Sequence, residues 1–432
     1  MKIHHELSLA LVVCCMQFSW AEPSILSLQD ALTLVQGQNL KVLAQAPVRR
    51  LSALQIDNAQ ASLWPTLSLT SDLSRPGPNL GGDPMLNAAS RSQYETSWRT
   101  NLAFKWVVFN GFGNWENLEL AKVSASTTQA RSEVELLQIR SQVASTYWEV
   151  ARNQELHKLR LLNLERSSEL LRIAQAKRAI GAGTLLESRQ AELDRNADQS
   201  AELKQRLSVR QSQRNLNALL NRDLETEFQV DSLAPMDTSL SKDALLASMQ
   251  QNHPILKAAQ LSEKASETGI RVAGSDWYPE VSVYANYNLL EQFNDQNPPP
   301  DLHRQGMLWG AQLTVPLFEG GSTRTKLASA KESRELARMT TQMIRADLDQ
   351  SLAVSWANFQ QSVELWRIEI NNASLADSTF QMAVEQFRLG ALSATEMRRF
   401  QESSAEAATR SAMARFDAKQ TEITVLSLAG ML

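Results

Sequence analysis

The chain has 432 residues, with 43 lysines and arginines against 47 aspartates and glutamates and a formal net charge of −4. This balance argues against a nucleic-acid partner, because proteins that bind nucleic acids concentrate basic residues on one face. No stretch after the N-terminus approaches 18 consecutive apolar residues, so no membrane-spanning helix is predicted. A chain of this kind that crosses a membrane must do so with strands.

The first 21 residues are typical of a secretory signal peptide. A mildly basic start precedes the apolar segment 7–20, and Ser19 and Ala21 place small residues at the spacing of a cleavage site. We expect cleavage after Ala21, with a buried N-terminal helix as the alternative. Cys14 and Cys15 both fall in this leader, so a mature chain without disulfides or a thiolate metal site is predicted.

The first half of the mature chain, 22–230, opens with a helical pattern and two alternating segments. We expect a helix over 27–62 and strands over 66–73 and 98–108. The residues between the two strands are rich in Gly, Pro and Asn, a composition typical of a surface loop.

Two long helices follow these strands. The sequence contains neither Gly nor Pro from 114 to 180, and a helix over 114–180 would be roughly 100 Å long at about 1.5 Å per residue. A second helix is expected over 184–220. Both are rich in Ala, Ser and Gln, and small residues let neighbouring helices approach closely, as in extended coiled coils. A soluble coiled-coil rod is the alternative interpretation of the helices alone.

The second half of the chain, 231–432, repeats this order. Its leading helix, two strands and two long helices are expected over 241–274, 281–290, 309–317, 322–389 and 393–428.

Equal spacings relate the two halves. Gly111 and Gly320 are 209 positions apart, and so are Gly181 and Gly390. The segment WPTLSL in the first half matches YPEVSV in the second, in the same order along the chain. Because ordered matches at one spacing indicate an internal repeat, we interpret the chain as a tandem duplication.

The predicted strands carry apolar residues on one face and polar residues on the other. In 98–108, for example, Leu102 and Phe104 share a face opposite to Asn101 and Lys105. Such strands suit a membrane β-barrel with a wet lumen, although a soluble sandwich strand alternates equally well. Four strands cannot close a barrel, and an open edge in lipid leaves backbone groups unpaired. Three chains would close twelve strands around a pore, whereas two chains giving about eight would fill their own interior, so a trimer is expected.

These features together resemble the TolC family of outer-membrane channel proteins, also called outer-membrane efflux proteins. The resemblance covers essentially the whole mature chain. It rests on the duplication, on the strand-to-helix joints VVFNGFG and VPLFEGG, on Pro65 and Pro279 at the first strand of each half, and on the helix turns AIGAGT and RLGALS.

The resemblance implies a mainly α-helical homotrimer in which a twelve-stranded outer-membrane β-barrel continues into a long periplasmic α-helical barrel. It also implies the exit duct of a tripartite efflux pump or a type I secretion system, passive and without cofactor or catalysis. The implied partners are a periplasmic adaptor protein, an inner-membrane transporter and outer-membrane lipid. The implied location is the outer membrane of a bacterial cell.

The resemblance further assigns functional residues. Glu187 and Glu396 each lie six residues beyond a turn glycine, where relatives place acidic residues facing the tunnel mouth, and together with Arg399 they are expected at a pore constriction. Like charges grouped there raise one another's pKa, and Arg399 is close enough along a helix to pair with Glu396. The helix turns that engage adaptors in relatives correspond here to Ile180, Gly181, Ala182, Gly183, Thr184, Leu389, Gly390, Ala391, Leu392 and Ser393.

Two positions depart from the pattern of the family. Some relatives carry an acidic residue where this chain has Arg399, and an arginine where it has Leu392. The bonds that close the best-studied members therefore do not transfer directly to this chain.

No catalytic constellation is evident in the sequence. After the leader only His157, His253 and His303 remain, far apart and without acidic or Cys partners at ligand spacing. The alternative function is a coiled-coil structural or binding protein of the cell envelope without a pore. The sequence leaves open whether the cargo is a small molecule or a secreted protein.

Overall fold

The computed structural model describes residues 25–75, 95–231, 236–237, 239–294 and 302–432. The predicted leader, 1–21, lies outside these residues, and so does most of the predicted loop between the first two strands. Helices make up most of the described chain. None of the described helices has a stretch long and apolar enough to span a membrane.

The chain divides into two compact units, and each takes segments from both halves of the sequence. We call them the turn unit, Met1–Asn39, Val143–Met236 and Ser362–Gln420, and the sheet unit, Leu40–Gln142, Asp237–Gln361 and Thr421–Leu432. The long helices α4 (Gly113–Ala179) and α8 (Ser322–Arg388) contribute to both units.

Helices at equivalent positions of the two halves have equal lengths. The pairs α1 and α6, α2 and α7, α4 and α8, and α5 and α9 contain 11, 22, 67 and 35 residues in each member. The remaining bounds are α1 Leu28–Gln38, α2 Leu40–Ala61, α5 Leu185–Leu219, α6 Lys242–Asn252, α7 Pro254–Ser275 and α9 Ala394–Leu428. These equal lengths support the tandem duplication.

The leading helices predicted over 27–62 and 241–274 are each broken once, so the prediction of single helices was wrong. Asn39 separates α1 from α2, and His253 separates α6 from α7, both with extended backbone angles. In the second case Pro254 disfavours helical geometry for the residue before it, and the His253 Nδ1 accepts a hydrogen bond from the Ile255 N–H at 3.3 Å. In the first case the Asn39 side chain donates to the Leu219 carbonyl at 2.7 Å.

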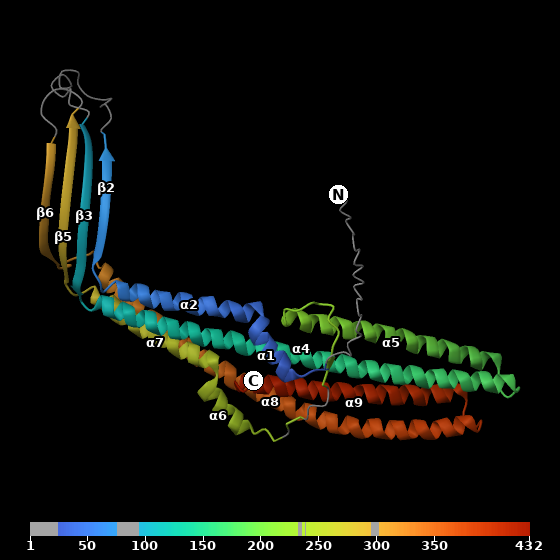
Figure 1. Ribbon diagram of the computed structural model, residues 1–432. Helices are drawn as coiled ribbons and strands as arrows, with labels where there is room; N and C mark the ends of the chain where they lie inside the picture. Colours follow the sequence, from blue (N-terminus) through green and yellow to red (C-terminus); the bar gives the residue numbers. More distant parts are fainter. Residues whose placement is uncertain (1–24, 76–94, 232–235, 238, 295–301) are drawn as a thin grey trace, which may run out of the picture. The chain divides into compact units, whose positions relative to one another are not determined.

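Four strands of the sheet unit form one antiparallel sheet in the order β2-β3-β5-β6 (Figure 1). Their bounds are β2 Thr66–Ser74, β3 Glu95–Asn110, β5 Glu280–Asn294 and β6 Leu302–Thr314.

The predicted strands are too short at the ends that adjoin the loops. The last predicted strand, 309–317, also extends beyond the end of β6 at Thr314. Strand pairing uses backbone groups, so it continues through polar residues such as Glu291 and His303, which are paired with each other. The strand predicted over 309–317 ends at Thr314. Pro316 follows, and proline has no N–H to donate to a ladder.

The register gives the sheet one apolar face. Leu69 of β2 lies opposite Leu102 of β3, Leu102 opposite Tyr287 of β5, and Tyr287 opposite Met307 of β6. One step along, Thr70, Asn101, Asn288 and Gly306 form the matching row on the other face. All four apolar residues of the first row are exposed within the chain, so the sheet presents a broad uncovered apolar surface.

In the turn unit, side chains of α4 form hydrogen bonds with the segment that follows α5. The short strands β1 (Ile25–Leu26) and β4 (Gln229–Val230) pair in parallel. The buried Tyr147 hydroxyl of α4 donates to the Leu26 carbonyl at 2.9 Å and accepts from the Asp231 N–H at 3.0 Å. Burial raises the pKa of this phenol to about 12, so it remains a donor at neutral pH.

Candidate docking site at the helix turns

The predicted site residues lie in the turn unit, where α4 joins α5 and α8 joins α9. At the first turn the Ala182 N–H donates to the Lys177 carbonyl at 2.9 Å, and the Gly181 N–H donates to the Arg178 carbonyl at 3.1 Å. This pair of bonds is the Schellman motif, which satisfies the last carbonyls of a helix.

The second turn has the same geometry. The Ala391 N–H donates to the Gln386 carbonyl at 2.9 Å, and the Gly390 N–H donates to the Phe387 carbonyl at 3.1 Å. The two turns are therefore copies of one structure, as the repeat predicts.

One glycine in each turn is required by backbone conformation. Gly181 and Gly390 have φ angles of 78° and 79°, in the left-handed region that other residues adopt at a cost. A Cβ atom at either position would meet no atom within 4 Å. The constraint is therefore conformational, and space around these glycines is open.

The following helices begin with reciprocal caps. The Glu187 N–H donates to the Thr184 hydroxyl at 3.2 Å while the Thr184 N–H donates to the Glu187 carboxylate at 2.9 Å, which is a capping box. In the second turn the Ser393 N–H and hydroxyl donate to the Glu396 carboxylate at 2.9 Å and 2.7 Å.

The two predicted constriction carboxylates therefore have a structural role in this chain. The hydrogen bond from the Ser393 backbone is the main cause of a lowered pKa for Glu396, followed by that from its hydroxyl. Arg399 is exposed and makes only the smallest named contribution to that pKa. The ion pairs that the structure gives for the described residues do not include one between Arg399 and Glu396, and the role of both in a constriction stays a prediction.

Large aliphatic side chains project from both turns. Ile180 is 80% exposed, Leu186 78% and Leu389 84%. Exposed apolar residues gathered at one place mark surfaces that bind other proteins. Leu392 differs, because it packs against a buried cluster formed by Phe380, Ala383, Phe387 and Met397.

Just behind the turns, Lys177 connects the ends of α4 and α8. Its Nζ donates to the Phe387 carbonyl at 2.7 Å and lies 4.0 Å from the centroid of the Phe387 ring. The ammonium thus caps the C-terminal end of the neighbouring helix, where cations are favoured.

A polar layer further from the turns joins α9 to α4 and α5, and the sequence analysis missed it. Arg398 of α9 donates to the Asp198 carboxylate of α5 at 2.7 Å, with only 19% and 10% of the two side chains exposed. Beside it, the buried Gln401 side chain donates to Asn163 Oδ1 of α4 at 3.0 Å. Burial alone would lower the pKa of the Arg398 guanidinium, but the hydrogen bond and charge of Asp198 raise it.

A second ion pair joins the two long helices. The Arg166 guanidinium of α4 donates to Asp377 of α8 at 2.6 Å and lies 4.5 Å from the centroid of the Phe380 ring. Among the described residues, no group of three or more His, Cys, Asp or Glu side chains could hold a metal ion. The contacts that the structure gives around the turns are helix caps and helix-to-helix contacts.

Comparisons with known proteins agree with this architecture. Residues 32–222 and 245–431 match the family described as outer membrane efflux protein. The outer membrane efflux protein BepC of Brucella suis biovar 1 is 20% identical over 300 residues, which are 69% of this chain and 62% of that protein. The outer membrane protein TolC of Vibrio cholerae serotype O1 is 22% identical over 385 residues, which are 87% of this chain and 81% of that protein.

Solved structures share the fold. The outer membrane protein VceC from Vibrio cholerae superposes with a TM-score of 0.75 at 16% identity, covering 93% of this chain and 96% of that one. The CmeC outer membrane channel of Campylobacter jejuni gives 0.77 at 15% identity, covering 100% and 94%.

Proposed function

We propose, because the chain belongs to the outer membrane efflux protein family, that it is the outer-membrane exit duct of a tripartite export system. In this role it conducts cargo passively from a periplasmic adaptor and an inner-membrane transporter to the exterior. It needs no catalysis and no cofactor for that.

The observation that carries the proposal is the open sheet of the sheet unit. Among the described strands β2 pairs only with β3, and β6 pairs only with β5, so both outer edges have unpaired backbone groups. In lipid each unpaired group costs several kcal/mol, and in water such edges promote aggregation. Together with the exposed apolar face, these edges favour a closed assembly of several copies in the outer membrane.

Three copies meet this requirement. The β2 edge of one protomer would pair with the β6 edge of the next, giving twelve strands with the apolar face toward lipid and the polar face toward a wet lumen. The helices of the turn unit would then extend into the periplasm, with the two turns of each protomer at their free end.

The turns would serve as the docking site for the adaptor. Six turns in a trimer would present exposed aliphatic residues such as Ile180 and Leu389, and exposed apolar residues gathered at one place mark surfaces that bind other proteins. Glu187 and Glu396, with Arg399 nearby, would line the narrow end of the lumen and favour cations.

The closure of the sheet is tested with engineered disulfides. The described residues contain no cysteine, so one cysteine in β2, scanned from Thr66 to Asp72, is combined with one replacing Gln312 in β6. Oxidation in membranes should give linked dimers and trimers and nothing larger. As a control, cysteines replacing Ala103 and Asn286, which face each other within one sheet, should leave the chain monomeric on a denaturing gel. Linked products no larger than dimers, or products that contain more than three chains, would contradict the trimer.

A further inference from the structure

The joint between β3 and α4 packs tightly against the joint between α7 and β5. A Cβ atom at Gly111 would lie 2.5 Å from the Tyr278 Cβ and 2.6 Å from the Ser275 carbonyl oxygen, far inside the optimal separation of about 3.5–4.0 Å for carbon atoms. A Cβ atom at Gly113 would lie 2.7 Å from the Ser275 hydroxyl. Glycine therefore lets these two segments approach each other closely.

The equivalent joint between β6 and α8 is open. Gly320, which lies 209 positions after Gly111, has the same φ angle of 63°, but a Cβ atom there would meet no atom within 4 Å. The aromatic residues that precede the two glycines differ in the same way. Phe109 is partly buried, whereas its equivalent Phe318 is 89% exposed. The second joint thus has the backbone geometry of the first without its contact.

The internal repeat identifies the segment that would make this contact. Helices α2 and α7 begin 214 positions apart, so Ser275 and Tyr278 correspond to Ala61 and Trp64. Ala61 is the last residue of α2, and Trp64 lies between α2 and β2. Ala61 is exposed, and Trp64 is 66% exposed.

This segment and Gly320 lie at opposite edges of the sheet. The segment leads into β2, whereas Gly320 follows β6, and these two strands are the outer members of the sheet (Figure 1). The two sites are therefore separated within one chain. Pairing of β2 of one copy with β6 of the next would bring them together.

We propose that Trp64 of one copy packs onto Gly320 of the next, as Tyr278 packs onto Gly111 within each chain. The inference rests on the closed assembly of the proposed function, and it adds the residues that join the copies beside the sheet. The occupant of the open joint is thus a second copy of this chain.

Charged residues beside the joints are complementary. Within the chain, the Arg271 guanidinium of α7 donates to the Glu116 carboxylate of α4 at 2.7 Å. The residue equivalent to Arg271 is Asp57 of α2, and the residue equivalent to Glu116 is Thr325 of α8, which directly follows Arg324. Opposite charges would therefore meet in the contact between copies as well, with the signs exchanged between the helices.

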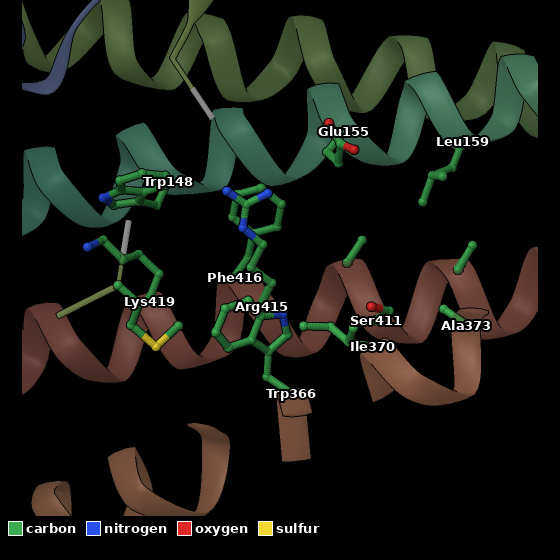
Figure 2. Close-up of a pocket in the computed structure, with 13 residues that line it drawn as sticks. Trp148, Glu155, Leu159, Trp366, Ile370, Ala373, Ser411, Arg415, Phe416 and Lys419 are labelled. Carbon is green, nitrogen blue, oxygen red and sulfur yellow. The ribbon is translucent and has the colours of Figure 1, made fainter. Parts of the chain in front are cut away.

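Both of these charged residues are accessible in the single chain. Asp57 and Arg324 are exposed, and among the described residues neither belongs to an ion pair. Other cations differ in this respect. In the groove of the turn unit that α4, α8 and α9 wall, for example, the Lys419 ammonium lies 5.4 Å from the centroid of the Trp148 ring (Figure 2).

Two glycine variants test the contact against a matched control. Gly320 and Gly321 both have positive φ angles, and a Cβ atom at either would meet no atom within 4 Å in the chain, so alanine has a similar local cost at both. Only Gly320→Ala should collide with the next copy, because the equivalent of Gly321 is Phe112, which has a side chain. We expect Gly320→Ala to give at least about tenfold less trimer than Gly321→Ala, measured by size in detergent-extracted membranes.

Engineered cysteines locate the contact directly. Ala61 and Ser322 are equivalent to Ser275 and Gly113, and a Cβ atom at Gly113 would lie 3.2 Å from the Ser275 Cβ, close to the separation in a disulfide. Ala61→Cys combined with Ser322→Cys should therefore link separate chains on oxidation in membranes, and either variant alone should not. As a control, Ser275→Cys combined with Gly113→Cys should close within one chain and leave it monomeric on a denaturing gel.

The cysteine pairs between β2 and β6 described above separate the possible failures. If those pairs link chains and the Ala61–Ser322 pair does not, the sheet closes and the contact at the joint is wrong. Absence of linkage from both would contradict the closed assembly, and this inference with it. Equal trimer from Gly320→Ala and Gly321→Ala, or linkage of position 61 only to a different protein, would also overturn the inference.

Discussion

In each helix turn, one positive φ angle is the reason that glycine is favoured. At Gly390 the φ angle is 79°, and a Cβ atom at that position would meet no other atom within 4 Å. At Gly269, inside α7, the space is equally open, and no positive φ is found there. The two glycines therefore separate the effect of conformation from that of packing.

Gly390→Ala should destabilise its turn by about 1–2 kcal/mol, the cost of the left-handed region for a residue with a Cβ. Gly269→Ala should stabilise α7 by up to about 1 kcal/mol, because alanine is the better helix former. Native-state hydrogen exchange at the Ala391 amide and within α7 measures both effects. A Gly390→Ala variant as protected as the original protein would mean that the left-handed turn is not required.

The cap of α9 should respond to acid through Glu396. Its pKa is lowered in the folded chain from the ordinary 4.5, so the ionised carboxylate stabilises the folded cap above that value, and this stabilisation is lost as pH falls through the folded pKa. Hydrogen exchange at the Ser393 and Glu396 amides, corrected for intrinsic rates, should therefore accelerate below about pH 4.5. Glu396→Gln should show no such acceleration, since glutamine also caps but does not titrate. The same acceleration in this variant would assign it to another group.

Some features of single residues could be predicted from the sequence. Gly181 and Gly390 were predicted at turns, and they are in the left-handed region that makes glycine favourable there. The capping role of Glu187 was not predicted, although the spacing from Thr184 is that of a capping box. The Asp198–Arg398 pair was missed because its members are 200 positions apart, and the position equivalent to Asp198 in the other half is Ala407, so the repeat gave no indication of it.

Among the elements, the long helices were easier to predict than the short ones. The bounds of α4 and α8 lie within one residue of the predicted ranges, because glycines mark both ends of each. The breaks at Asn39 and His253 were not predicted. Pro254 was a usable signal for the second break, but Pro47 lies within α2 without ending it, so proline alone does not locate such breaks.

The hairpins formed by α4 with α5 and by α8 with α9 should depend on the Asp198–Arg398 pair. Asp198→Asn keeps the shape of the side chain but removes its charge from a mostly buried arginine. The expected loss is about 1–3 kcal/mol of local stability, measured by denaturant dependence of hydrogen exchange in α9. In contrast, Glu169→Gln disrupts a pair with Arg172 whose side chains are 41% and 73% exposed, and should leave the local stability nearly unchanged, because solvent screens an exposed pair. Equal effects of the two variants would show that the buried pair does not join the hairpins.

At the scale of the whole molecule, the sequence predicted the four strands of the antiparallel sheet and their two faces, and the sheet register agrees with those faces. The short strands β1 and β4 were not predicted. The need for other copies follows from the open edges of the sheet. The sequence of a single chain does not show how many copies assemble, because the outer strands β2 and β6 gain their second partners only on assembly. The trimer was therefore inferred from the requirement for closure, and the family supports the same inference.

The central claim is that the assembled protein is a conducting duct. The most direct test is single-channel recording in a planar lipid bilayer with the purified trimer fraction, separated from monomer by size. Discrete steps of ion conductance from the trimer, absent from the monomer fraction, are the predicted result. A trimer that inserts into the bilayer and conducts no ions under any applied voltage would contradict the account.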